Sequence, residues 1–180
     1  MESRCAHRIG FGNDVHRLAT GRKLILGGVE VPFELGPVGH SDGDALAHAV
    51  CDALLGAAAL GDIGRHFPDT SPEWHNASSL TFLRRAQELL DQAGYRIINV
   101  DSTISLERPK LAPFISQMKE KLAEALGIEA QQVSIKAKTG EGVDAIGRGE
   151  AIRADAVVLI EPLAAAFPPQ KKGRGQTGFI

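Results

Sequence analysis

A proline-free run rich in alanine and leucine occupies residues 45–60 and predicts one long, closely packed helix. Upstream of it, Ser41 fits the N-cap position, and Asp44 three residues later completes a capping-box pattern. Asp44, His48 and Asp52 are four residues apart and therefore share one helix face. An imidazole between two carboxylates is oriented as a metal ligand requires. A solvated face with helix-stabilising pairs is the alternative.

A second pattern of metal-ligand type precedes this helix. Residues 8–16 are predicted to form a strand, and Asp14 and His16 lie on the same side of it because side chains alternate along a strand. Together with His48 they supply one carboxylate and two imidazoles, which zinc prefers in open catalytic sites. Two unrelated surface residues are the alternative for Asp14 and His16, since sequence spacing does not measure the distance to His48.

The remaining elements do not alternate as strictly as in a doubly wound fold. We predict a hairpin over 24–33, helices over 78–93 and 113–126, and strands over 98–106, 133–137 and 154–160, the last one central. This order predicts a single α+β domain with a mixed β-sheet and helices packed on one face. The domain spans 1–162. Residues 163–180, rich in alanine, proline, lysine and glycine, are predicted to be a disordered tail.

Composition excludes several functional classes. A formal net charge of −2 argues against a nucleic-acid partner, which normally requires a basic surface. No apolar run approaches the length needed to cross a membrane. We find no secretory signal pattern ahead of Cys5 and Cys51, so we expect two reduced thiols and a cytoplasmic protein.

Several motifs occur in the order typical of one enzyme family. They are Asp14-Val15-His16, His40-Ser41-Asp42-Gly43-Asp44 with His48, Gly61-Asp62-Ile63-Gly64, Phe67-Pro68-Asp69-Thr70 and Gly147-Arg148-Gly149-Glu150. Residues 8–162 resemble the 2-C-methyl-D-erythritol 2,4-cyclodiphosphate synthases of non-mevalonate isoprenoid biosynthesis. These enzymes are homotrimers that bind zinc and a second divalent cation, Mg²⁺ or Mn²⁺. They cyclise 4-diphosphocytidyl-2-C-methyl-D-erythritol 2-phosphate and release CMP.

The resemblance implies a role for each matching position. Asp14, His16 and His48 would bind zinc, and Glu141 would bind the second cation. His40 and Thr139 would be the catalytic residues. The substrate-binding positions implied are Asp14, His16, His40, Ser41, Asp62, Gly64, Phe67, Asp69, Leu106, Lys110, Ala112, Ala137, Lys138, Thr139, Glu141 and Arg148. Among them, Asp62 and Gly64 would hold the methylerythritol part, and residues 106–112 and 137–139 would contact the cytidine diphosphate.

Two other functions remain open on the residues alone. Asp14, His16 and His48 fit a zinc hydrolase that attacks a phosphoester with metal-bound water equally well. The segment with Lys110 and the carboxylate of Glu141 favour the cyclase over the hydrolase. A non-catalytic trimeric binding module would keep the core but lose the polar site residues, all of which are present.

Overall fold

The computed structural model describes residues 7–163, and its centre is a five-stranded sheet ordered β4-β1-β7-β5-β6. The strands are β1 (Arg8–Thr20), β4 (Leu35–Pro37), β5 (Tyr95–Ser105), β6 (Val133–Lys138) and β7 (Ala151–Pro162). β5 and β6 are parallel, and the other neighbouring pairs in this sheet are antiparallel. A separate hairpin pairs β2 (Leu24–Leu26) with β3 (Val29–Val31). The predicted mixed sheet and its predicted central strand, β7, are confirmed.

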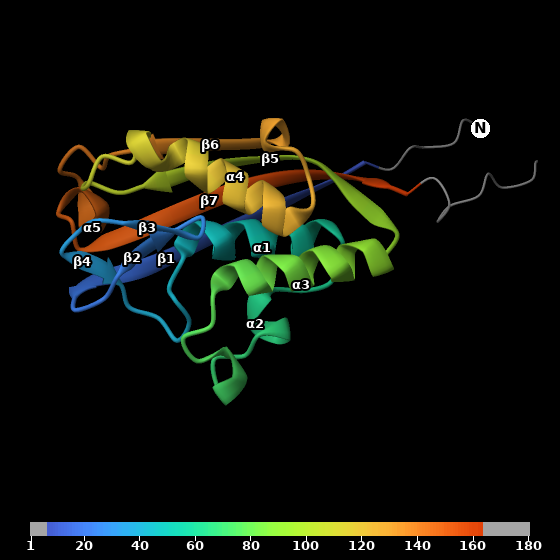
Figure 1. The fold of residues 1–180 in the computed structure, drawn as a ribbon, viewed down its shortest axis with the longest axis horizontal. Helices are drawn as coiled ribbons and strands as arrows, with labels where there is room; N and C mark the ends of the chain where they lie inside the picture. Colours follow the sequence, from blue (N-terminus) through green and yellow to red (C-terminus); the bar gives the residue numbers. More distant parts are fainter. Residues whose placement is uncertain (1–6, 164–180) are drawn as a thin grey trace, which may run out of the picture.

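The long helices lie along one side of the sheet (Figure 1). They are α1 (Ala45–Ala57), α3 (Ser79–Gln92) and α4 (Ile115–Leu126). α1 packs against β1 and β7, α3 packs against α1, and α4 packs against α3 and β6. The short helical segments are α2 (Ile63–His66), α5 (Asp144–Gly147) and the 3₁₀ turns Pro72–Trp74, Ala112–Phe114 and Ala130–Gln132. The predicted α+β architecture is confirmed. No helix within residues 7–163 combines the length and apolar character needed to cross a membrane.

Element lengths differ from those predicted. The strand predicted over 8–16 continues to residue 20, and the helix predicted over 45–60 ends at residue 57. Ala59 is in the left-handed conformation, and Leu60 N donates to Leu55 O, so the helix closes before the glycine expected to end it. The segments β4, α2 and α5 were not predicted, because three or four residues are too few to show a periodic pattern.

The predicted tail is described only at its first residue. Leu163 N donates to Gly94 O at 2.8 Å, which ties the end of β7 to the turn after α3. Residues 164–180 lie outside the described part of the chain, as does Cys5. The predicted free thiol of Cys51 is buried within α1.

Two glycines of β1 allow α1 to lie directly on the strand. A Cβ atom on Gly12 would be only 2.2 Å from Ala49 O, and one on Gly10 would be 1.9 Å from Ala53 O. Both distances are far below van der Waals contact, so a larger residue at either position would displace the helix. This close approach determines how far side chains on β1 lie from side chains on α1.

The opposite face of the sheet exposes apolar side chains. Ile9, Phe11 and Val15 on β1 are 72%, 57% and 57% exposed, and Val157 on β7 is 42% exposed. The strand register places Phe11 directly beside Val157. Contiguous exposed apolar residues of this kind mark surfaces that bind another protein. This face is therefore a candidate surface for self-association.

The N-terminus of α1 differs from the predicted capping box. Asp44 and not Ser41 is the N-cap, and its Oδ1 accepts from Ala47 N at 3.0 Å. The buried Asp44 carboxylate also accepts from Gly27 N at 2.9 Å and from Gly28 N at 2.7 Å. The predicted cap is wrong because these hairpin donors come from a distant part of the sequence. Burial raises the pKa of Asp44 to about 6, and the backbone donors oppose that rise.

Asp44→Ala should lower the free energy of unfolding by roughly 3 kcal/mol, because three N–H groups lose their acceptor and each loss costs about 1–3 kcal/mol. Urea titration followed by circular dichroism measures the change. Asp52→Ala is the matched control, since Asp52 lies on the same helix and accepts one backbone bond, from Ile63 N at 2.9 Å. Equal losses in the two variants would contradict the role of Asp44 as a shared acceptor.

Candidate functional site

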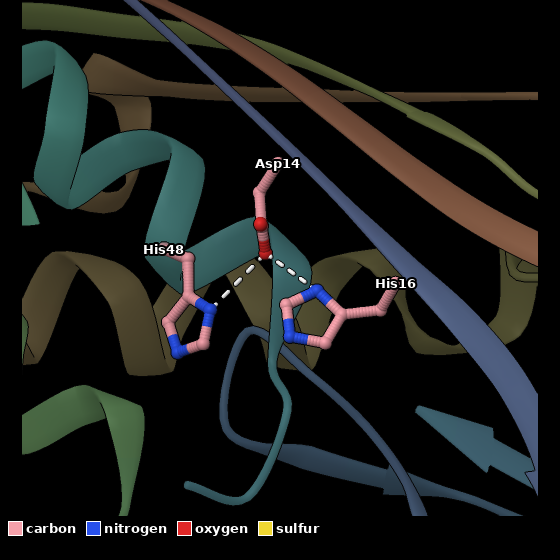
Figure 2. Close-up of side chains that lie close together, drawn as sticks. All are labelled: Asp14, His16 and His48. Atoms are coloured by element: carbon pink, nitrogen blue, oxygen red, sulfur yellow. Dashed lines mark hydrogen bonds and ion pairs between the residues drawn. The ribbon is translucent and has the colours of Figure 1, made fainter. Parts of the chain in front are cut away.

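Three potential metal ligands converge where β1 passes the first turns of α1 (Figure 2). Asp14 Oδ2 lies 2.9 Å from His16 Nδ1 and 3.1 Å from His48 Nδ1. Asp14 and His16 extend from β1, and His48 meets them from α1. Their side chains are between 13% and 22% exposed, so the group remains accessible to a small ligand. The fold therefore brings together the three ligands that the two separate sequence patterns predicted.

The arrangement of these atoms fits a divalent metal ion. His16 Nδ1 is buried and makes no well-oriented hydrogen bond within the described residues, although Asp14 Oδ2 is close to it. Two donor atoms bound at about 2.0–2.1 Å to a tetrahedral zinc ion lie roughly 3.3 Å apart, close to both separations from Asp14 Oδ2. Two imidazole nitrogens and one carboxylate oxygen form an open site with a position left for substrate.

Asp14 and His48 stabilise each other's charged forms. Burial alone would raise the pKa of Asp14. The two neighbouring imidazole rings have a larger, opposite effect, and together these effects lower the pKa to about 2. Burial lowers the pKa of His48, but the Asp14 carboxylate, together with Asp44 and Asp42, more than offsets this, and the pKa is raised. Asp14 is therefore ionised at neutral pH, as a metal ligand must be.

The carboxylates expected to flank His48 on its own helix bind other groups. Asp44 caps α1, and Asp52 accepts from Ile63 N at the start of α2. His48 instead takes its carboxylate partner from β1, at Asp14. The prediction that Asp44 and Asp52 orient His48 is therefore wrong, because backbone donors from the hairpin and from α2 hold those carboxylates.

A cavity of about 410 Å³ opens beside the metal ligands. It is lined by His16, His40, Ser41, His48, Ile63, Gly64, Phe67, Pro68, Asp69, Trp74 and Phe82. The ring of Phe67 lies 4.6 Å from that of Phe82 and 5.3 Å from that of Trp74, so the three aromatic residues form one apolar wall. Metal ligands, polar groups and an apolar wall together suit a small polar molecule with a hydrocarbon part. A larger cavity, of about 660 Å³, lies beside the C-terminal ends of α3 and α4 and contains none of the predicted site residues.

Arg22 holds the segment that carries His40 and Ser41, and sequence reasoning did not single it out. Its guanidinium donates to Pro37 O at 3.1 Å, to Gly39 O at 3.2 Å and to Ser41 O at 3.0 Å. Charge-assisted bonds to three carbonyls restrict the chain that leads into α1. A lone arginine has no periodic or spacing signal, so only the structure identifies this role.

The residues expected at the cytidine end form a second group at the ends of β5 and β6. They are Leu106, Lys110, Ala112, Ala137, Lys138 and Thr139, with Glu141 and Arg148 in the turns that follow. Leu106 N donates to Lys138 O at 2.9 Å, and Glu107 Oε2 accepts from Gly140 N at 2.9 Å. These bonds join the two segments to each other. None of the second group lines the cavity beside the metal ligands in the described part of the chain.

Three of the predicted residues, one of them outside both groups, contact near neighbours in the chain. Asp62 is the N-cap of α2, and Thr139 Oγ1 donates to Glu141 Oε1 at 3.2 Å. Arg148 Nε donates to Glu150 Oε1 at 2.9 Å. These three side chains and their partners Glu141 and Glu150 are exposed, so each remains available to a ligand or to another chain.

Comparisons with known proteins agree with the geometry. The model of the YgbB family matches residues 7–161. The chain is 58% identical over 154 residues to 2-C-methyl-D-erythritol 2,4-cyclodiphosphate synthase of Solibacter usitatus (strain Ellin6076), a match that covers 86% of this chain and 97% of that protein. These matches confirm the resemblance drawn from the sequence motifs.

Solved structures with the same architecture include two that bear on function. A 2C-methyl-D-erythritol-2,4-cyclodiphosphate synthase in its CDP-bound form matches with a TM-score of 0.79 and 41% identity, over 85% of this chain and 99% of that one. The bifunctional IspDF from Campylobacter jejuni matches with a TM-score of 0.85 and 37% identity, over 88% of this chain. The chain spans 43% of that bifunctional protein.

Proposed function

The chain belongs to the YgbB family, and on that basis we propose that it acts as a metal-dependent cyclodiphosphate synthase in non-mevalonate isoprenoid biosynthesis. It converts 4-diphosphocytidyl-2-C-methyl-D-erythritol 2-phosphate into 2-C-methyl-D-erythritol 2,4-cyclodiphosphate. An oxygen of the 2-phosphate bonds to the β-phosphorus while the bond from that phosphorus to CMP breaks. Because ring closure expels CMP without water, the activity is that of a phosphorus–oxygen lyase, and we place it in the cytoplasm.

The convergence of Asp14, His16 and His48 beside a cavity of about 410 Å³ is the observation that carries this proposal. Both reacting groups are phosphates, so their negative charges oppose ring closure. A divalent cation held by these residues supplies charge neutralisation and alignment, which is most of what phosphoryl transfer requires of a protein. We assign zinc, because two imidazoles and one carboxylate are among its preferred donors.

We assign two polar groups that line the cavity to the reacting phosphates. His40 Nε2 donates to Ser71 O at 3.2 Å, which leaves Nδ1 for a ligand. Ser41 Oγ accepts from Gly43 N at 3.2 Å, which leaves the hydroxyl hydrogen for a phosphate oxygen. Donors aimed at oxygens where charge develops lower the barrier. We assign this catalytic role to His40, and to Thr139 in the second group.

The cytidine diphosphate end is assigned to the joined ends of β5 and β6. The CDP-bound form of a similar synthase supports a cytidine nucleotide as ligand. Lys110 is exposed there and carries a positive charge suited to a diphosphate. We assign the second cation, Mg²⁺ or Mn²⁺, to the exposed carboxylate of Glu141, because both ions prefer oxygen donors.

A homotrimer with shared sites accounts for two features of the single chain. The apolar face that includes Phe11 and Val157 is exposed, and the second group of site residues lies outside the cavity beside the metal ligands. We infer that packing of the exposed faces around a threefold axis brings the metal ligands of one chain to the cytidine-binding segments of the next. We therefore propose that each active site is composed of two chains.

Mixing two inactive variants should restore activity if the sites are shared. His48→Ala chains lack the metal half and Lys110→Ala chains lack the cytidine half. Random exchange of equal amounts into cyclic oligomers should rebuild about one quarter of the sites. Turnover measured after exchange under mild urea tests this, and the double variant His48→Ala/Lys110→Ala mixed with His48→Ala is the control. No recovery after mass spectrometry has demonstrated exchange would contradict shared sites.

Phosphorus NMR of one incubation tests the proposed reaction. The protein, the cytidyl substrate, Zn²⁺ and Mg²⁺ should yield the resonances of a cyclic diphosphate together with CMP. A zinc hydrolase would instead produce an open-chain phosphate. That product, or unchanged substrate with a metal-loaded protein, would overturn the cyclase assignment.

A further inference from the structure

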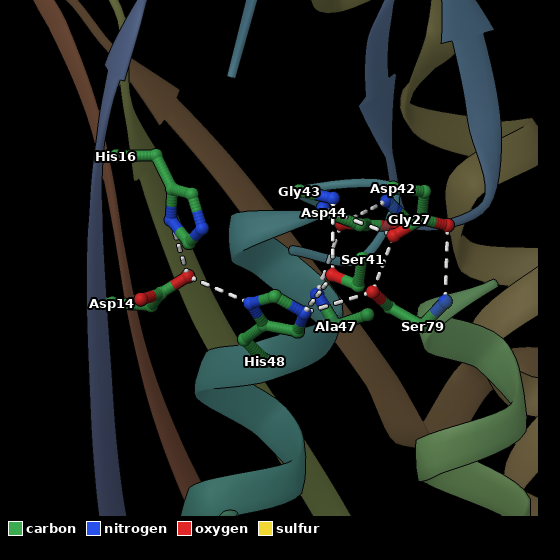
Figure 3. Close-up of polar contacts among 10 residues, drawn as sticks. All are labelled: Asp14, His16, Gly27, Ser41, Asp42, Gly43, Asp44, Ala47, His48 and Ser79. Carbon is green, nitrogen blue, oxygen red and sulfur yellow. Dashed lines mark hydrogen bonds and ion pairs between the residues drawn. The ribbon is translucent and has the colours of Figure 1, made fainter. Parts of the chain in front are cut away.

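A buried serine contacts the side of the His48 ring that faces away from the metal ligands. Ser79, the first residue of α3, has no exposed surface, and its Oγ lies 2.8 Å from His48 Nε2 (Figure 3). Ser79 also contacts Asp42: its hydroxyl donates to Oδ1, and its backbone N donates to Oδ2 at 3.0 Å. A chain of contacts therefore runs from Asp42 through Ser79 to His48.

The donors and acceptors in this chain allow one assignment. A serine hydroxyl has a single hydrogen, and Asp42 as a carboxylate can only accept it. With its hydrogen directed at Asp42, Ser79 Oγ presents lone pairs to His48 Nε2. The contact at 2.8 Å is a hydrogen bond only if Nε2 carries a hydrogen and donates it. The neutral ring of His48 then has an unprotonated Nδ1.

The other ring nitrogen, Nδ1, faces the metal ligands. It lies 3.1 Å from Asp14 Oδ2. This contact is an ion pair when Nδ1 carries a hydrogen, and an unprotonated Nδ1 and the carboxylate oxygen can instead bind one metal ion together. We propose that Ser79, held by Asp42, is a positioning residue that selects the Nε2–H tautomer of His48 and so presents Nδ1 to the metal ion. The inference rests on the proposed metal-dependent function and adds two residues to its metal centre, since neither Ser79 nor Asp42 was among the predicted site residues.

A second hydroxyl near the same ring nitrogen does not replace Ser79. Ser41 Oγ lies 3.1 Å from His48 Nε2, farther away than Ser79 Oγ, and it accepts from Gly43 N. No carboxylate holds the Ser41 hydroxyl hydrogen in the described structure, so this group can turn to accept from or donate to the ring. Ser41 is therefore compatible with either tautomer. Only Ser79, through Asp42, distinguishes between them.

The ring nitrogen of His48 that carries the hydrogen can be measured in the zinc-loaded protein. Long-range ¹H–¹⁵N spectra of protein labelled with ¹⁵N-histidine and loaded with zinc report whether that hydrogen is on Nε2 or on Nδ1. Wild type should show Nε2–H for His48. Ser79→Ala should show a mixture of Nε2–H and Nδ1–H. Ser78→Ala is the matched control, because Ser78 is the exposed neighbouring serine and its side chain makes no capping hydrogen bond.

Zinc affinity, measured by competition with a chromophoric chelator, gives the functional consequence. Ser79→Ala should bind zinc about 10- to 100-fold more weakly than wild type, as is typical when a hydrogen-bond partner of a ligating histidine is lost. Ser78→Ala should bind zinc like wild type. Asp42→Asn should weaken zinc in the same direction, because its amide can donate to Ser79 and turn the hydroxyl hydrogen toward Nε2. If Ser79→Ala does not fold, the zinc affinity of Asp42→Asn tests the role of Ser79 instead, and wild-type affinity in this variant would overturn the inference.

The two measurements separate this inference from the proposed function. A wild-type protein that binds no zinc would overturn the metal assignment and, with it, the inference that rests on it. If wild type binds zinc and Ser79→Ala retains both the Nε2–H tautomer and wild-type affinity, Ser79 has no positioning role. A fall in melting temperature alone, with the tautomer and affinity unchanged, would show that Ser79 serves only the packing of α3 and would equally overturn the inference.

Discussion

Replacing His48 with alanine should lower turnover by roughly 1000-fold, because a metal ion that stabilises phosphate charge contributes several kcal/mol and each 1.4 kcal/mol is a factor of about 10. Wild type should contain about one zinc ion per chain, and the variant should lose most of it because one of three ligands is gone. The fold should persist, since α1 is held by its buried alanine and leucine residues and not by the imidazole. A turnover assay, metal analysis and circular dichroism of the purified variant measure these three effects.

A second histidine variant serves as the control for metal content. His66 lies on α2, donates from Nε2 to Leu60 O at 2.9 Å and belongs to neither group of site residues. His66→Ala should therefore keep the zinc content of wild type. Full zinc occupancy in His48→Ala, measured alongside this control, would mean that His48 is not a ligand.

Gly12→Ala should both destabilise the protein and damage the metal centre. The new methyl group would lie 2.2 Å from Ala49 O, so α1 has to move away from β1. Inserting a methyl group into a packed core commonly costs 1–3 kcal/mol, and here we expect about 3 kcal/mol because the obstacle is backbone. A shift of about 1 Å between Asp14 and His48 should reduce turnover by roughly 100-fold. Urea titration measures the loss of stability, a turnover assay measures the loss of activity, and zinc competition measures the damage to the metal centre.

The same substitution on the helix should have the opposite effect on stability. Gly56 lies on α1, and a Cβ atom there would meet only Phe11 O at 4.0 Å. Gly56→Ala should stabilise the chain by about 0.5–1 kcal/mol, because alanine favours helix more than glycine does. If Gly12→Ala proved as stable as Gly56→Ala, with unchanged zinc affinity, then close contact between β1 and α1 would not control the site.

The order and type of the long elements were predictable because each has its own local pattern. In α4, Met118, Leu122 and Leu126 recur every four residues, and all three are fully buried. Gly127 ends that helix with a φ of 64°, as its position predicted. Patterns of this kind depend only on neighbouring residues, so they can be read without knowledge of the fold.

Local sequence patterns predict the wrong buried residue or helix cap where a distant segment competes. Strict alternation counted back from the buried Val100 in β5 would place Ile98 inward, but a register shift between Ile97 and Asn99 buries Ile97 instead. Ser41 fits a local cap pattern, yet the hairpin donors favour Asp44 as the N-cap. In each case the competing interaction comes from another element, and no window of adjacent residues contains it.

Sequence alone determined the fold class, the family and the chemical types of the metal ligands, because helix and strand periodicity and donor chemistry reside in short stretches. Asp14 and His48 are far apart in the sequence. Only the tertiary structure decided that Asp14 Oδ2 and His48 Nδ1 lie 3.1 Å from each other. That distance depends on the contact of Gly12 with the backbone of α1, and the orientation of His48 depends on Ser79 from a different helix. Contacts between elements arise from packing in three dimensions, and local sequence patterns do not encode them.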